Sequence, residues 1–367
     1  MRISLHFLSI TLLLLRADVI CAQVSDPSAS HALNKAILDG PPYRAVAIQV
    51  RRVDWIDRYI RCIDDIANLG ADTVSIAVET HMENSSASKL WLDLRFTPTS
   101  DQLGRLIDHA RAKGLRVMLV PSVAVAERAG GAWCGTIRPA SWEQWWASYR
   151  DLIHHFAWIA RDHHVEILCV GASLISTESH AAEWRETIAV ARKEFPGKLI
   201  YSASWDHYEQ VPFWSDLDMI GMNAYWRLGS NRFVSGEQLQ NCWKEIQDNL
   251  VSLARKIGKP VLFTEVGYCS LPSAVYAPWD PTITQNVADL ETQERLYQAF
   301  LQAWHGNPML AGFVISKWTP DEGGLQDQGY TPQGKPAEAV LRSWLTEPRW
   351  SVRSRPPTTG LPAQGAR

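Results

Sequence analysis

The sequence has no strong charge of either sign. Its 367 residues contain 36 Lys and Arg against 39 Asp and Glu, which gives a formal net charge of −3. A protein whose main task is to neutralise nucleic-acid phosphates carries a basic excess, so this balance argues against a nucleic-acid partner. Hydrophobic residues make up 46% of the chain. That is enough apolar material for a large core, and it excludes disorder of the whole chain.

Cysteine is scarce, and no two cysteines stand in a CxxC motif. Five of the six cysteines follow residue 22, an odd number without metal-ligand spacing. Neither a zinc site nor a disulfide framework is indicated, and we expect neither a metal nor a cofactor. A single disulfide stays open for an exported protein, but the spacing does not choose its pair.

Long apolar runs are absent after the N-terminus. Arg2 precedes a short apolar run at residues 7–15 (FLSITLLLL), and small residues near Cys21 and Ala22 permit cleavage. The run is too short to span a bilayer and is typical of a secretory signal. We therefore expect residues 1–22 to be a signal peptide, with a retained anchor as the alternative. The mature chain would then be secreted or periplasmic, without a membrane span.

The rest of the chain divides into a polar lead-in, one long alternating region and a tail. Residues 23–42 are rich in small polar residues, and residues 347–367 are rich in Pro, Gly and Arg, which is typical of a flexible tail. Between them, apolar runs of strand length alternate with amphipathic segments of helix length. Strands are expected at 45–50, 73–78, 116–120, 167–170, 199–203, 219–224, 261–264 and 312–315. Helices are expected at 56–69, 100–113, 142–161, 181–194, 237–257, 293–304 and 337–345, with no long helix after the fifth strand.

Eight short strands, each apolar on both faces, favour a parallel sheet. Eight strands over residues 43–346, seven of them followed by a helix, suit a single-domain α/β fold, the (β/α)8 TIM barrel. The doubly wound alternative would place a Gly-rich turn after its first strand, whereas AVAIQV is followed by RRVDW. The sequence therefore predicts a barrel, whose site lies at the C-terminal ends of the strands.

Glu265 is the strongest single candidate at these strand ends. It comes directly after the apolar run VLFT, where a barrel strand reaches the site. A strand-end Glu can also satisfy loop amides or pair with an Arg. Tyr225 ends the preceding strand and could hydrogen-bond that carboxylate, steadying its charge. The alternative for Tyr225 is a buried Tyr with a local partner.

Tryptophan is unusually frequent, with 17 in the chain. Several tryptophans fall in expected loops or strand ends, and the flat apolar face of an indole stacks well on the C–H face of a sugar. Each could instead be packing, but together with a carboxylate they favour carbohydrate as the partner. The candidates for binding a saccharide are Trp133, Trp205, Trp226, Trp279 and Trp318, with Asn223 and Tyr225 beside them.

Four motifs resemble the (β/α)8 glycoside hydrolases of clan A. They are LFTEVGY at the seventh strand, GMNAYW at the sixth, WRETIAVAR on the fourth helix and GKPAEAVL near the end of the barrel. The sequence is most similar to glycoside hydrolase family 113 and its exported relatives, a family associated with β-mannanase activity. The resemblance spans residues 43–346. It implies a retaining enzyme that acts on a β-mannan-like or other β-glycan, with Glu265 as the nucleophile.

The same resemblance places the acid/base after the fourth strand, where this chain departs from the family. The family pattern is Gly-(Thr/Ser)-Glu-Leu, and this chain has Gly171-Ala172-Ser173-Leu174. Ser173 therefore occupies the acid/base position, and its hydroxyl cannot protonate a glycosidic oxygen at neutral pH. Two more strand ends depart, because relatives often have Trp-Glu-Trp where this chain has Ser316-Lys317-Trp318, and Ser204 stands where an Asn is expected.

Two interpretations follow from these departures. In the first, the chain remains a glycosidase and another carboxylic acid supplies the proton. Glu178 is the nearest candidate, although an acid in the first turn of a helix is also favoured by the helix dipole. Glu79 and Glu83 are less favoured substitutes. In the second, the barrel is a catalytically impaired carbohydrate-binding protein, a pseudoenzyme. An interaction scaffold without a ligand would explain the fold but not the aromatic residues.

Overall fold

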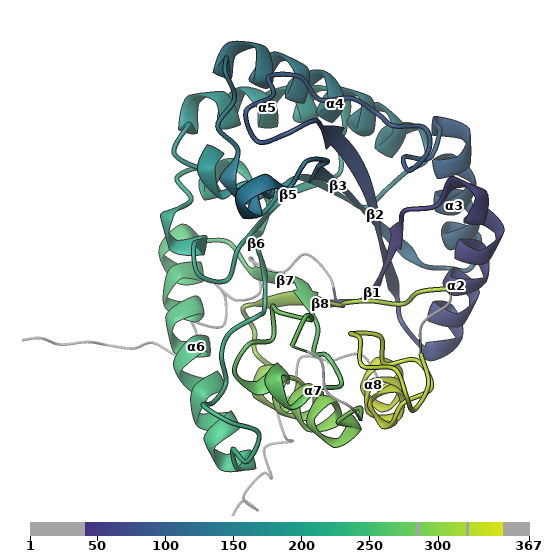
Figure 1. Cartoon of the computed structure of the whole chain (residues 1–367), viewed down its shortest axis with the longest axis vertical. Coiled ribbons are helices and arrows are strands. Elements are labelled where there is room, and N and C mark those ends of the chain that lie inside the picture. Colours follow the sequence, from purple (N-terminus) through teal and green to yellow (C-terminus); the bar gives the residue numbers. More distant parts are fainter. Residues whose placement is uncertain (1–40, 284–286, 321–322, 348–367) are drawn as a thin grey trace, which may run out of the picture.

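The computed structural model describes residues 41–283, 287–320 and 323–347. Within them, eight parallel strands form a closed barrel in chain order, with β8 pairing to β1 (Figure 1). The expected signal peptide, nearly all of the lead-in and nearly all of the tail lie outside the described residues. The strands are β1 (Tyr43–Val50), β2 (Thr73–Met82), β3 (Arg116–Val125), β4 (Ile167–Ala172), β5 (Lys198–Ala203), β6 (Ile220–Asn223), β7 (Val261–Val266) and β8 (Leu310–Ile315).

Seven longer helices of the described residues surround the barrel (Figure 1). Between β5 and β6 lie only two short 3₁₀ turns, Tyr208–Gln210 and Trp214–Asp216, as the sequence predicts. The predicted single-domain (β/α)8 barrel is confirmed. None of the described helices is long and apolar enough to span a membrane. The helices are α2 (Ile56–Leu69), α3 (Ser100–Ala112), α4 (Trp142–Asp162), α5 (Ala181–Glu194), α6 (Gly236–Ile257), α7 (Leu290–Trp304) and α8 (Pro336–Thr346).

Local sequence signals account for where the helices begin and end. Thr99 opens α3 with a capping box completed by Gln102, and Ser235 opens α6 in the same way with Gln238. These side chains satisfy backbone N–H groups that have no partner inside the helix. Gly258 ends α6 in the left-handed conformation, which suits a residue without a Cβ.

The strands separate two apolar layers. Side chains that point inward fill the barrel interior, including Met118, Ile200 and Leu262, while alternate residues such as Ile48 and Val78 pack against the helices. This alternation follows from the two-residue period of a strand. It determines which strand-end side chains face the C-terminal end of the barrel, called the top below.

Candidate active site

Glu265 and Tyr225 meet at the top of the barrel. Glu265 lies near the end of β7, and Tyr225 follows the end of β6, the neighbouring strand. The Tyr225 hydroxyl donates a 2.9 Å hydrogen bond to Glu265 Oε2. Burial raises the pKa of Glu265, while this hydrogen bond and the positive charge of Lys317 lower it. The hydrogen bond between the two predicted residues is the interaction that the sequence suggested.

Residues that follow β8 complete this side of the top. Ser316 lies near enough to the Tyr225 hydroxyl to oppose the rise that burial causes in its pKa, and the Tyr330 ring lies edge-on to Tyr225 with 6.0 Å between ring centres. Among the described residues, Lys317 is the one charged side chain whose field shifts the pKa of Glu265. No described carboxylate acts on Glu265 in this way. Glu265 thus has tyrosines, a cation and the thiols of Cys134 and Cys169 within electrostatic reach, and no described carboxylate.

Ser173 follows β4, three strands from β7. Its backbone has φ 52°, in the left-handed region that few residues other than glycine adopt. The conformation is held by a 2.8 Å hydrogen bond from the Ser173 N–H to the Ser202 carbonyl. The Cys134 thiol, on the loop after β3, also contacts the Ser173 carbonyl at 3.7 Å. The position that the resemblance assigns to the acid/base thus has a serine with a neighbouring thiol instead of a carboxyl group.

Glu178 has a carboxyl group, but its hydrogen bond ties it to the helix layer. It is 4% exposed and accepts a 2.8 Å hydrogen bond from the Tyr201 hydroxyl. Tyr201 is fully buried, and its ring packs against Trp184 of α5 and against Phe213. Burial raises the pKa of Glu178 to about 7, with the Tyr201 hydrogen bond opposing that rise. Its pKa would suit a general acid, whereas its hydrogen-bond partner belongs to the layer between the barrel and the helices.

Three of the predicted aromatic residues form one cluster over β5, β6 and β7. The Trp205 and Trp279 rings stack with 5.4 Å between centres and 21° between planes, and Trp226 meets Trp205 edge-on. Trp279 is 46% exposed. Asn223 fixes the backbone at Trp205, because its side-chain oxygen accepts a hydrogen bond from the Trp205 backbone N–H at 2.8 Å. The Trp205–Trp279 stack thus leaves part of a flat apolar indole open to solvent.

The other two predicted tryptophans lie elsewhere. Trp133, on the loop after β3, is 41% exposed, and its indole lies close over Gly135 of the same loop. Trp318 is 3% exposed and aims its indole N–H at Asp65 of α2, 3.5 Å away. The structure therefore brings Trp318 into the layer between the barrel and α2, because the chain turns outward after β8.

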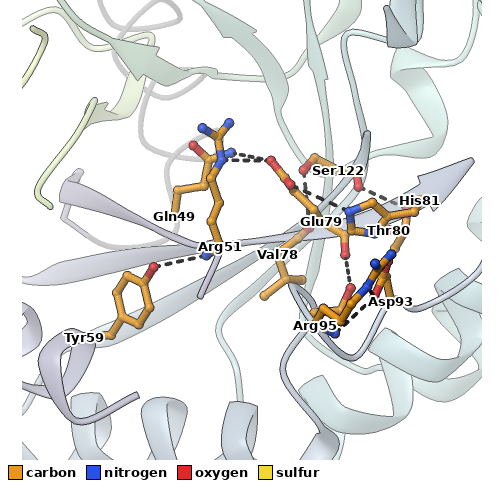
Figure 2. A network of polar contacts seen from close by, with 11 residues as sticks. Gln49, Arg51, Tyr59, Val78, Glu79, Thr80, His81, Asp93, Arg95 and Ser122 are labelled. Atoms are coloured by element: carbon orange, nitrogen blue, oxygen red, sulfur yellow. Dashed lines mark hydrogen bonds and ion pairs between the residues drawn. The ribbon is translucent and has the colours of Figure 1, made fainter. Parts of the chain in front are cut away.

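Three features at the top were not singled out from the sequence. Cys134 and Tyr330 stand on loops without a strand-end pattern, so only the folded chain brings them to Ser173 and Tyr225. The third is the ion pair of Arg51 with Glu79, whose Nε and Oε1 atoms are 2.9 Å apart (Figure 2). Both residues follow apolar strand runs in the sequence, and that position was the available signal.

The described residues contain no group of three or more His, Cys, Asp or Glu side chains placed to hold a metal ion. Burial raises the pKa of the Cys134 thiol to about 11. The five cysteines within the described part of the chain are free thiols.

Comparisons with known proteins agree with the barrel fold. The family model of glycoside hydrolase family 113 matches residues 49–335. A β-mannanase of that family from Alicyclobacillus acidocaldarius, solved in complex with ManMIm, is 27% identical, with a TM-score of 0.76 over 84% of this chain and 99% of that chain. No curated protein matches the chain by sequence.

More distant structures share the fold alone. A Faecalibacterium prausnitzii β-glucuronidase is 11% identical, with a TM-score of 0.58 over 85% of this chain and 50% of that chain. A family 5 mannosidase from Rhizomucor miehei, solved as a point mutant in complex with mannosyl-fructose, is 10% identical, with a TM-score of 0.57 over 83% of this chain and 92% of that chain.

Proposed function

The chain belongs to glycoside hydrolase family 113, and from this premise we propose that its barrel binds a β-linked saccharide and attacks it with Glu265. The observation that carries the proposal is the Tyr225–Glu265 hydrogen bond of 2.9 Å at the end of β7. It holds a carboxylate in one orientation at the end of the barrel where sites of this fold lie. The β-mannanases among the structural neighbours favour a β-mannan-like glycan.

The reaction we propose is the first half of a retaining mechanism. A Glu265 oxygen bonds to the anomeric carbon as the bond from that carbon to the leaving oxygen breaks, and the electron pair departs with that oxygen. The Tyr225 hydrogen bond and the charge of Lys317 favour the ionised carboxylate that this step needs. The Trp205–Trp279 stack and Asn223 would hold the saccharide beside it.

The step that this chain lacks is proton transfer. A departing sugar oxygen needs a proton, and the later attack of water needs a base; in retaining relatives one carboxyl group serves both steps. Ser173 occupies that position and cannot do either. We do not assign the task to Glu178, because its carboxyl group is bound to Tyr201 in the helix layer. Loss of general acid–base catalysis removes about 10²–10⁴-fold of rate.

Activated glycosides test this proposal directly. The dinitrophenolate leaving group of a 2,4-dinitrophenyl β-mannoside departs without being protonated. Azide is a nucleophile that attacks a glycosyl-enzyme without the help of a base. We expect measurable release of dinitrophenolate, acceleration by azide, and loss of both in Glu265→Ala. Rapid turnover of natural β-mannan that azide leaves unchanged would contradict the absent acid/base. No turnover of any activated β-glycoside would contradict the nucleophile.

A second function is favoured by the three departures at Ser173, Ser204 and Ser316-Lys317. Under this alternative the barrel is a carbohydrate-binding protein that has lost turnover, and Glu265 and the tryptophans bind the sugar without cleaving it. Saccharide binding by calorimetry, together with no glycosyl-enzyme from activated substrates, would select it. Under either function we propose export to a secreted or periplasmic location, which the apolar N-terminal run favours.

A further inference from the structure

A second polar site lies at the top of the barrel, on β1 and β2. Ala47 of β1 packs against the barrel interior, and Val78 of β2 packs on the opposite, helix-facing side. Because strand side chains alternate, Gln49, two residues after Ala47, and Glu79, next to Val78, face the interior side and lie at the top. Around the closed barrel β2 is three strands from β7, as β4 is on the other side. Glu79 and Ser173 therefore follow strands that are equally far from the strand of Glu265, in opposite directions around the barrel.

The hydrogen bonds of the Glu79 carboxylate are made by one of its two oxygens, Oε1. Arg51 Nε and Gln49 Nε2 both donate to Oε1, at 2.9 and 3.2 Å (Figure 2). Among the described residues no donor lies within hydrogen-bond distance of Oε2, and His81 Nε2 is 4.0 Å away. The terminal nitrogens of Arg51 likewise make no hydrogen bond to a described residue. An open acceptor thus stands beside open donors.

The backbone beneath this site is fixed. The Arg51 N–H donates to the buried Tyr59 hydroxyl at 3.1 Å, and the Thr97 hydroxyl donates to the Glu79 carbonyl at 2.6 Å. The Thr80 hydroxyl also donates to the Ser122 carbonyl of β3 at 3.0 Å. Ordering these side chains on a ligand would therefore cost little backbone freedom.

The loop after β2 adds aromatic surface. Trp91 pairs its backbone with His81, whose ring lies 5.6 Å from the Phe96 ring. Trp91 and Phe96 are about as exposed as each other, at 40% and 39%. His81 itself is buried, and its Nδ1 has no hydrogen-bond partner among the described residues. A sugar subsite combines polar groups that hydrogen-bond the sugar's hydroxyls with flat aromatic rings that stack on the sugar ring.

From this arrangement we infer a saccharide subsite at the ends of β1 and β2, in which Glu79 and Arg51 bind adjacent hydroxyl groups of a neutral sugar. Glu79 Oε2 accepts from one hydroxyl, and an Arg51 terminal nitrogen donates to the other. The sugar is neutral because the two side chains already cancel each other's charge. The Arg51 guanidinium would repel the charge of an amino sugar, and the Glu79 carboxylate would repel the charge of a uronic acid. The inference deepens the proposed function by placing sugar binding across the top from the Trp205–Trp279 stack.

Calorimetry with hexasaccharides tests the subsite independently of catalysis. Mannohexaose and cellohexaose are titrated in a Glu265→Gln background, which prevents hydrolysis of the probe. We expect Glu79→Gln and Arg51→Gln each to weaken binding about 10- to 100-fold, as hydrogen bonds to charged groups do. Glu83→Gln is the matched control, since Glu83 is exposed on the loop after the same strand. Binding of the neutral probes should change little between about 50 and 500 mM salt, because no net charge is neutralised.

Each contrary outcome overturns the subsite. These are Glu79→Gln binding like Glu83→Gln, no binding of either neutral hexasaccharide, or tighter binding of a chitosan or uronate hexasaccharide. Unchanged affinity in the Glu265→Gln background, together with an azide-restored loss of kcat when Glu79→Gln is made in the chain that keeps Glu265, would instead make Glu79 the missing base. Glu79→Asp, which keeps the charge, should retain part of the affinity and guards against a folding defect in Glu79→Gln. Failure of the proposed function is seen separately, as no turnover of dinitrophenyl β-mannoside by the wild type.

Discussion

Glu265 and Glu178 are chemically similar side chains in different layers of the barrel. Each accepts one tyrosine hydroxyl, at 2.9 Å from Tyr225 and 2.8 Å from Tyr201, and burial raises both pKa values. Tyr225 lies at the top with Ser316 and Tyr330, whereas the Tyr201 ring is enclosed by residues of the helix layer. A raised pKa therefore does not distinguish Glu265, which we propose as the nucleophile, from Glu178. The layer to which the tyrosine partner belongs does distinguish them.

The largest expected effect separates the two carboxyl groups directly. Glu265→Ala should lower turnover of dinitrophenyl β-mannoside by about 10⁴–10⁶-fold, because the nucleophile is removed. Glu178→Gln should leave the same rate within about threefold, an expectation that follows from its place in the helix layer. Steady-state kinetics on both variants checks this. Equal losses in the two variants would put Glu178 in the site.

Restoring a carboxyl group at the end of β4 should have the next largest effect. Ser173→Glu should raise hydrolysis of natural β-mannan by about 10²–10⁴-fold and remove the acceleration by azide. Ser173→Gln is the control, since it has the same shape without a proton to give. Both side chains share the left-handed backbone already adopted by Ser173. Reducing-sugar release measures the gain, and equal rates for the two variants would refute an acid/base defect.

Glu178 should affect the stability of the fold and its pH dependence, not the rate of hydrolysis. Its pKa is raised from 4.5 to about 7 in the folded protein, so the folded state holds the proton more tightly than the unfolded state. The free energy of unfolding should therefore fall as pH rises from about 4.5 to about 7, by about 3 kcal/mol. Glu178→Gln should remove this component of the pH dependence. Urea melts at several pH values measure it, and an unchanged slope would contradict the burial of the charge.

The smallest expected effect comes from the two tyrosines. Tyr225→Phe removes a hydrogen bond that lowers the pKa of Glu265, so that pKa should rise and the acid limb of the pH–rate profile should move to higher pH. We expect a fall in kcat of about tenfold near neutral pH. Tyr201→Phe is the matched control, and its profile should keep its midpoint. A shift of equal size in both variants would mean that the tyrosines act through the fold alone.

Much of the fold was predictable, because local signals decide it. Apolar runs located all eight strands, and the lack of a long helix after β5 was readable in the sequence. The place of Glu265 near the end of β7 could be predicted for the same reason, since it follows an apolar run directly. The side-chain direction of Glu178 could not, because it depends on Tyr201, 23 residues away on the outward face of β5. Nor could the burial of Trp318, which depends on contacts between distant elements.

The Arg51–Glu79 pair shows what a strand pattern leaves open. Both positions could be placed at strand ends, but their contact depends on the register that pairs Val50 of β1 with Val78 of β2. Register is a property of the closed barrel, and a shift of one residue would turn Glu79 toward the helices. A sequence thus predicts which residues reach the top more readily than which of them touch.

Trapping the covalent intermediate tests the role of Glu265 most directly. The protein is incubated with 2,4-dinitrophenyl 2-deoxy-2-fluoro-β-mannoside, whose leaving group needs no proton, and is then digested for mass spectrometry. We expect one fluorosugar per chain, attached to the peptide that contains Glu265 and released faster in azide. A label on Glu178 or Glu79, or no label while the same protein turns over the unfluorinated substrate, would contradict Glu265 as the nucleophile.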